Sequence, residues 1–480
     1  MIGRRVSAPR VHGDLHALPC DPLAVPRGSA SINAGCCCAL RGGAQANHAP
    51  ASGCVRAAAS SRAGSPSLQP SAQLRWQAAA AQVRHAATWQ QLDALYSSAW
   101  TAEVAVAALA RLARLVVQPP KQRAERAAVR ALCGRLCAAT AAGQLHGLGP
   151  RQLSTLMWAA AKLPSIIADA SMPWQAAQLL PGRLEAGAGS AQDVSMALWA
   201  AAKLGMQPPP GWLDAMAGAL LQRLDSSQPQ TLANSAWALA SLQHDPGDEW
   251  LGAVAGRAAA LMPQFSEQGL SSLVWALARL GAGQHCTAGS RLLAEVLQQA
   301  AVQLPSMSPQ AASMLLWALA TMDITPPQPW LAAYHAATAP RLRQWASQDL
   351  SLSIWAHARL RVRPPAGWHA AFAAASASRL PSASAQELAN MVWGLAKLGL
   401  LPSSSWLVAW QAAMQTAMNS YCAPALAMSA YALALMGVRP SAAWMNLLLQ
   451  ETARQMPVFG AQVLRIMLGT WCLLPAVPCA

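Results

Sequence analysis

Basic side chains recur at one position of a repeated segment, and their regular spacing suits the binding of a chain of phosphate groups. We number each copy from its central aromatic residue, which is position 0. Position +4 is then basic in five copies, at Lys162, Lys203, Arg279, Arg359 and Lys397. A column of cations could neutralise about one phosphate per residue along a single strand of RNA. Alternatively, these are ordinary solvated cations near helix C-termini, where the helix dipole favours positive charge.

Position −3 of the same segment varies from copy to copy, whereas the residues around it hardly change. Its polar occupants are Thr155, Asn234, Ser272 and Asn390, and the other copies carry Met or Leu there. A variable residue in a constant framework is what readout of one base per repeat requires, as in other helical-repeat RNA readers. Neutral drift of a surface residue would produce the same variation.

Helical geometry predicts that positions −6, −3, +1 and +4 form one exposed stripe. Position +1 is Ala in seven copies and Gly394 in the eighth, which would leave room for a ligand to approach the helix. Asp193, Asp349 and Glu387 at position −6 would repel phosphate. They argue against an RNA track that runs over every repeat.

The segment that carries these positions occurs eight times at nearly constant intervals. The copies span 151–163, 192–204, 230–242, 268–280, 310–322, 348–360, 386–398 and 424–436, and their central aromatics are Trp158, Trp199, Trp237, Trp275, Trp317, Trp355, Trp393 and Tyr431. In six copies a second Trp follows at a constant distance, after a Pro-rich turn, as Trp250 follows Trp237. Pro ends one helix and is tolerated in the first turn of the next. Each unit is therefore predicted to be helix A, a turn and helix B, with both Trp columns in the core.

Hairpins of two short helices cannot bury their apolar faces alone, so neighbouring hairpins must stack. We expect an all-α fold, a right-handed α-solenoid of helix-turn-helix repeats, each of about 38 residues. Residues 71–150 are interpreted as degenerate N-terminal helical repeats that form a cap. Residues 151–480 form the solenoid, with about eight full repeats and a terminal half repeat near Gly469 that lacks the aromatic. That half repeat is either a cap or the trace of a truncated gene model.

Residues 1–70 resemble an organellar transit peptide, because they are rich in Arg, Ser and Ala, poor in acids, and lack a continuous apolar run. A disordered tail or a mistaken gene start would also fit. Chloroplast and mitochondrial peptides share this composition, and we expect the chloroplast. The net charge of +15 favours an anionic partner, but residues 158–480 contribute only +3 of it. No apolar stretch reaches the roughly 20 residues of a membrane span.

Catalytic and metal-binding signatures are missing from the sequence. The 11 Cys residues form no disulfide framework, and Cys133 and Cys137 lack partners at zinc-binding spacing. No phosphate-binding loop, HExxH or GxSxG motif occurs, and the His residues lack acidic partners. His357, at position +2, is interpreted as a core or groove side chain. We therefore expect no enzyme activity, no metal and no cofactor.

The repeat resembles the octotricopeptide repeat, and the resemblance is clearest in QPQTLANSAWALASLQ at 228–243 and in QELANMVWGLAKLGLLPSSSW at 386–406. The resemblance covers roughly residues 88–469. It implies an organellar RNA-binding solenoid, found mostly in green algae and related to the FAST-kinase-like mitochondrial RNA proteins. Such proteins act in transcript stability, splicing, processing or translation, and RNA-processing or ribosomal proteins can be further partners.

Many members of that family end in a nuclease-like RAP domain. Only TWCLLPAVPCA follows Gly469 here, so we expect any catalytic role of that domain to be absent. The sequence thus favours a protein that binds single-stranded organellar RNA in post-transcriptional gene expression. The alternative is a scaffold that binds a peptide or helix of another protein in the same groove.

Overall fold

The computed structural model describes residues 70–458, apart from positions 117, 119, 121, 143, 144, 165, 167–170, 282–286 and 439. All regular structure in this part of the chain is helical. The expected all-α solenoid is confirmed, because successive helices pack side by side along the chain. The transit-peptide prediction for 1–70 and the terminal half repeat beyond 458 lie outside the described residues. The chain forms two compact units that divide between Trp212 and Leu213.

The N-terminal unit contains the degenerate repeats and the first regular ones. Its helices are α1 (Pro70–His85), α2 (Trp89–Leu95), α3 (Ala102–Leu115), α4 (Arg123–Ala142), α5 (Pro150–Lys162), α6 (Ser171–Glu185) and α7 (Ala191–Leu204). Helix α3 packs on α5, and α5 packs on α7. Helix α4 pairs with α3, and α6 pairs with α5, as the second helices of two hairpins. Helix α3 therefore takes the place of a helix A ahead of the first regular copy.

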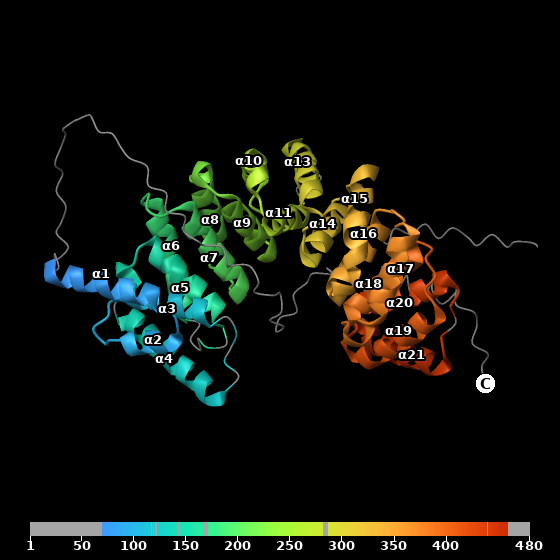
Figure 1. Ribbon diagram of the computed structural model, residues 1–480, viewed down its shortest axis with the longest axis horizontal. Coiled ribbons are helices and arrows are strands. Elements are labelled where there is room, and N and C mark those ends of the chain that lie inside the picture. Colours follow the sequence, from blue (N-terminus) through green and yellow to red (C-terminus); the bar gives the residue numbers. More distant parts are fainter. Residues whose placement is uncertain are drawn as a thin grey trace, which may run out of the picture. The chain divides into compact units, whose positions relative to one another are not determined.

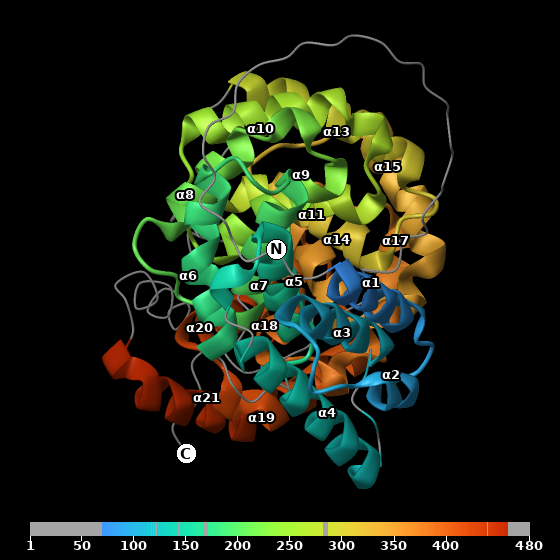
Figure 2. The same cartoon turned by 90° about the vertical axis from the view of Figure 1, so that its left-hand side faces the viewer.

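The C-terminal unit is two-layered. Its helices, from α8 (Trp212–Leu221) onward, are α9 (Pro229–Ser241), α10 (Asp248–Ala260), α11 (Glu267–Arg279), α13 (Thr287–Gln303), α14 (Pro309–Thr321), α15 (Gln328–Thr338), α16 (Ser347–Arg359), α17 (Ala366–Ala377), α18 (Ala385–Lys397), α19 (Ser404–Ala417), α20 (Ala423–Met436) and α21 (Ala442–Gln455). The A helices α9, α11, α14, α16, α18 and α20 pack consecutively. In Figures 1 and 2 they line the inside of the arc that this unit forms, and α10, α13, α15 and α17 lie outside them. The A helices thus provide the inner face.

The second Trp column lies in the core, as predicted. Its members Trp212, Trp250, Trp330, Trp368, Trp406 and Trp444 are all buried. Several of their indole N–H groups donate to the preceding B helix: Trp330 to the Leu297 carbonyl at 3.0 Å, and Trp368 to Thr338 Oγ1 at 2.9 Å. Because a buried indole N–H needs an acceptor, these bonds fix the register between neighbouring B helices.

Small residues at fixed positions let adjacent A helices approach closely. The predicted exposure of position +1 is wrong, because these residues are buried in every copy. A Cβ added at Gly394 would lie 2.9 Å from the backbone oxygen of Ile354 in the preceding A helix. The small side chain at +1 therefore serves helix packing, and it leaves no open space for a ligand.

The acidic residues at position −6 join neighbouring A helices at their N-terminal ends. Asp193 and Glu387 complete capping boxes with Ser190 and Ser384. The same carboxylates also accept hydrogen bonds from the preceding A helix, such as that from Ser347 Oγ to Glu387 at 2.8 Å. Asp349 accepts from Ser313 Oγ at 3.1 Å in the same way. These carboxylates thus cap the A helices, and their negative charge interacts favourably with the N-terminal end of the helix dipole.

In most repeats, the residue at position +6, just after helix A, has a left-handed backbone conformation. This residue is Gly205, Gly281, Gly399 or Gly437 in four repeats, but it is Gln243, Asp323 or Arg361 in three others, with φ of 57°, 60° and 57°. In these three repeats the next amide N–H bonds back to the carbonyl five residues earlier, as from Val362 to His357 at 2.9 Å. Left-handed backbone costs a residue with a side chain about 1–2 kcal/mol, and Asp somewhat less.

Candidate nucleic-acid interface

The first aromatic column lies where the core meets the inner face. The rings of Trp275, Trp317 and Trp393 are buried, whereas Trp158, Trp199, Trp237, Trp355 and Tyr431 are half-buried. Ring centroids of consecutive repeats are 6.3–6.4 Å apart, with interplanar angles of 30–31°, for Trp237–Trp275, Trp317–Trp355 and Trp355–Trp393. The prediction that this column is core therefore holds for only part of it.

Four of the +4 cations lie over these rings, namely Lys162, Lys203, Arg279 and Lys397. Lys162 Nζ is 5.2 Å from the ring centroid of Trp199 in the next repeat, and Lys397 Nζ is 6.0 Å from that of Tyr431. Arg279 lies over Trp275 of its own repeat at 5.5 Å. Cation–π attraction holds the charge near the ring, so these side chains are partly oriented before any ligand binds. Within each unit, we call the +4 cations and the first aromatic column the cation–aromatic row.

The row extends one repeat farther towards the N-terminus than the sequence predicted. The guanidinium of Arg114, at the end of α3, lies 5.6 Å from the ring centroid of Trp158. The sequence signal was weak, because α3 lacks the central Trp from which position +4 is counted. Arg114 is assigned to the row by the packing of α3 against α5 and by its position over the Trp158 ring.

The cations perturb each other electrostatically. Burial, followed by the charge of Lys162, lowers the pKa of Lys203. Burial lowers the pKa of Arg279 as well. The pKa of Lys397 is lowered by burial and then by the nearby charge of Arg361. Like charges held close together create a positive potential that an anionic ligand would relieve.

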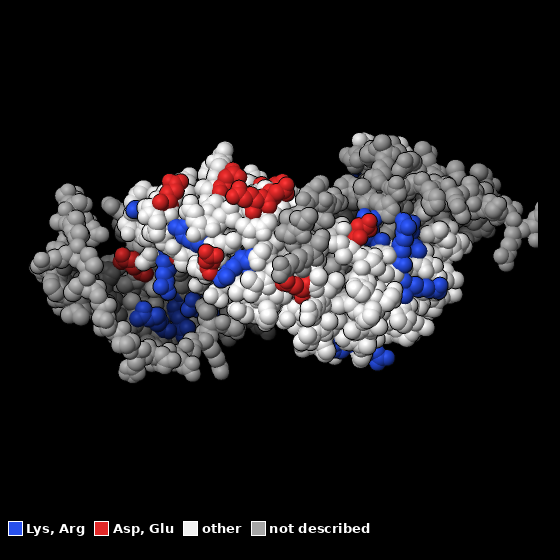
Figure 3. Space-filling model, turned by 90° about the horizontal axis from the view of Figure 1, so that it is seen from above, with Lys and Arg blue, Asp and Glu red and all other residues white. Residues whose placement is uncertain are grey.

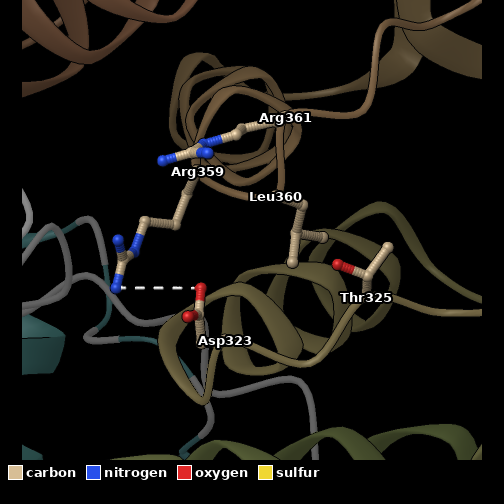
Figure 4. Close-up of a pocket in the computed structure, with 5 residues that line it drawn as sticks. All are labelled: Asp323, Thr325, Arg359, Leu360 and Arg361. Atoms are coloured by element: carbon tan, nitrogen blue, oxygen red, sulfur yellow. Dashed lines mark ion pairs between the residues drawn. The ribbon is translucent and has the colours of Figure 1, made fainter.

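Arg359 in the row has a carboxylate neighbour. Its Nη2 lies 4.0 Å from Asp323 Oδ1, which belongs to the loop after the preceding A helix. Figure 4 shows Arg359 pointing towards Asp323, with Arg361 beside it at the end of α16. These residues, with Thr325 and Leu360, line an open pocket of about 480 Å³.

The candidate base-reading residues differ in accessibility. Thr155, Asn234 and Ser272 are half-buried and lie one helical turn before the ring of their own repeat. Asn390 is only 1% exposed, and its Oδ1 accepts a hydrogen bond from Gln386 Nε2 at 2.9 Å. Contact between a ligand and Asn390 would first require movement of the residues that cover it.

A pair of buried histidines lies between α15 and α16, away from the row. His335 Nε2 and His357 Nε2 are 2.8 Å apart, and His357 Nδ1 donates to the Ser353 carbonyl at 2.7 Å. His357 Nε2 must therefore accept from His335. Burial lowers the pKa of His335 to about 4 and that of His357 to about 3. The interpretation of His357 as a core side chain is confirmed, since it is fully buried.

Charge is sparse elsewhere on the surface. The face drawn in Figure 3 is mainly uncharged, with Lys and Arg in a few small groups. Among the described residues, no group of three or more His, Cys, Asp or Glu side chains could hold a metal ion. Within the same part of the chain, no helix has the length and hydrophobicity needed to cross a bilayer.

Comparison with known proteins gives one family match. Residues 191–324, from the start of α7 to the turn after α14, match the family model of the N-terminal domain of the Tbc2 translation factor. No curated protein matches the sequence. The matched segment includes Lys203, Asn234, Ser272 and Arg279 of the candidate interface. The chain is thus similar, over part of its repeats, to a domain of a translation factor.

Proposed function

We propose that this protein binds single-stranded RNA along its A helices and acts in organellar gene expression, with translation of a transcript as its principal role. The observation that carries the proposal is the cation–aromatic row. Cations interleaved with aromatic rings along the A helices fit a single strand, whose phosphates are evenly spaced and whose bases can stack.

A single strand fits this row better than an acidic peptide does. The five predicted cations and Arg114 lie on six different A helices, one on each, and the intervening A helices α9 and α14 carry Ser241 and Thr321 at position +4. This favours a ligand with one charge per repeating unit, as in a nucleic acid backbone. Binding of a protein segment in the same groove is the competing function, and a segment without net charge would bind with little dependence on salt.

The match to a translation factor domain supports a role in translation over the other steps of RNA metabolism. The composition of residues 1–70 supports import into an organelle, and we propose the chloroplast. In this proposal the protein has no catalytic activity. It holds a transcript in a conformation that ribosomes can use, and it recruits other proteins.

The proposal is tested by crosslinking the tagged protein to RNA in its own cell, followed by purification and sequencing of the bound RNA. We expect one or a few organellar transcripts to be enriched, and ribosome occupancy on them to fall when the gene is disrupted. Recovery of proteins without any enriched RNA would refute RNA binding. Enrichment of a transcript with unchanged ribosome occupancy would refute the role in translation and leave RNA binding intact.

A further inference from the structure

Two charged residues occupy backbone conformations that favour glycine. Asp323 and Arg361 have φ of 60° and 57°, at the position that four other repeats fill with Gly. Both side chains are exposed, so neither is retained for packing. A strained residue with no packing role points to a function for its side chain. Gln243 has the same conformation but carries no charge.

The two charges lie next to the cation–aromatic row. Position +6 of one repeat adjoins position +4 of the next, as the 4.0 Å separation of Asp323 and Arg359 shows. One repeat later, Arg361 lies close enough to Lys397 for its charge to lower the pKa of that lysine. In Figure 4, Arg359 at the end of α16 extends towards Asp323, and Arg361, just past the end of that helix, lies farther from the carboxylate.

We propose that Arg361, with Arg359 and Lys397, forms the strongest phosphate-binding cluster of the row, and that Asp323 weakens binding at the same place. This inference rests on the proposed RNA binding and assigns unequal roles to the repeats. The Arg359 and Arg361 side chains line a single opening, and Lys397 lies close enough to Arg361 to be affected by its charge. Arg forms paired hydrogen bonds to phosphate oxygens. The Asp323 carboxylate neutralises part of this charge and repels a phosphate that approaches Arg359.

The opposing charges make a prediction in which folding stability and RNA binding change in opposite directions. Arg361→Gly removes a cation and relieves the left-handed strain, so its melting temperature should rise while RNA binds several-fold more weakly. The slope of log K against log salt concentration should fall in magnitude by about 0.7. Asp323→Asn removes the carboxylate and keeps a residue that tolerates this backbone, so RNA should bind more tightly.

The test measures binding of a mixed-sequence, fluorescein-labelled single-stranded RNA to the full chain over a range of salt concentrations. Gln243→Gly is the matched control, because it relieves the same strain without a change in charge. It should raise the melting temperature as Arg361→Gly does, with an unchanged salt slope. Arg361→Gly with the affinity and slope of the unchanged protein would overturn the inference and leave RNA binding intact. Absence of RNA binding by the unchanged protein would overturn the proposed function, and this inference with it.

Discussion

The buried pair of His335 and His357 should make one part of the solenoid sensitive to acid. Both rings have a lowered pKa in the folded chain, to about 4 and about 3, whereas an unfolded His titrates near 6.5. Below pH 6.5 the unfolded segment therefore binds more protons than the folded one. The stability of this segment is complete above that pH and falls as the solution is acidified towards the folded values.

The size of the effect follows from the distance between the working pH and 6.5. At pH 5 each ring that stays neutral in the fold costs about 2 kcal/mol, at about 1.4 kcal/mol per pH unit. His357 should contribute this amount, because it is fully buried. His335 lies nearer to water, which screens its charge and reduces its share. We expect a total loss of between about 2 and 4 kcal/mol.

Hydrogen–deuterium exchange of the full chain is the suitable assay, because a long repeat array does not unfold in one step. Peptides from α15 and α16 should lose protection between pH 7.5 and 5, after correction for intrinsic exchange, by more than peptides from α9 and α11. The control is the double variant His335→Ala and His357→Leu, since Ala and Leu occupy these positions in other repeats. An equal acid-induced loss of protection in the double variant would refute the assignment to the histidines.

Two further predictions concern packing and readout. Gly394→Ala should destabilise the C-terminal unit by about 1–3 kcal/mol, because the new Cβ would lie 2.9 Å from the Ile354 carbonyl oxygen. Gly256→Ala in α10 meets no atom within 4 Å and should instead stabilise by about 0.5–1 kcal/mol, and denaturant melts compare the two. Asn234→Ser should change the preferred sequence in a selection from random RNA, and a uniform loss of affinity would argue against base readout.

Much of the fold was predictable because the repeat gives the same information many times. The Pro-rich turns and the second Trp of each copy predicted the hairpins and the buried outer column. The exposure of position +1 was predicted wrongly. An Ala column at helical spacing is compatible with an open groove and with close packing, and only the neighbouring helix at Ile354 distinguishes the two.

The candidate site was predictable in its cations but not in its detail. Counting from the central Trp identified Lys162 and Lys397, but it could not place them over the rings of the next repeat. Arg114 was missed because its helix lacks the aromatic. Asp323 and Arg361 were missed because a left-handed backbone residue that is not Gly leaves no sequence signal. All these contacts join different repeats, so the sequence of one repeat does not contain them.

The central claim is that RNA runs along the cation–aromatic row, and the salt dependence of binding tests it most directly. The full chain and a variant with Lys203, Arg279, Arg359 and Lys397 changed to Ala are titrated with single-stranded RNA, after circular dichroism shows equal helicity. We expect weaker binding by the variant and a salt slope smaller in magnitude by about 3, from about 0.7 for each lost phosphate contact. Equal slopes for the two proteins would contradict the assignment of the RNA to this row.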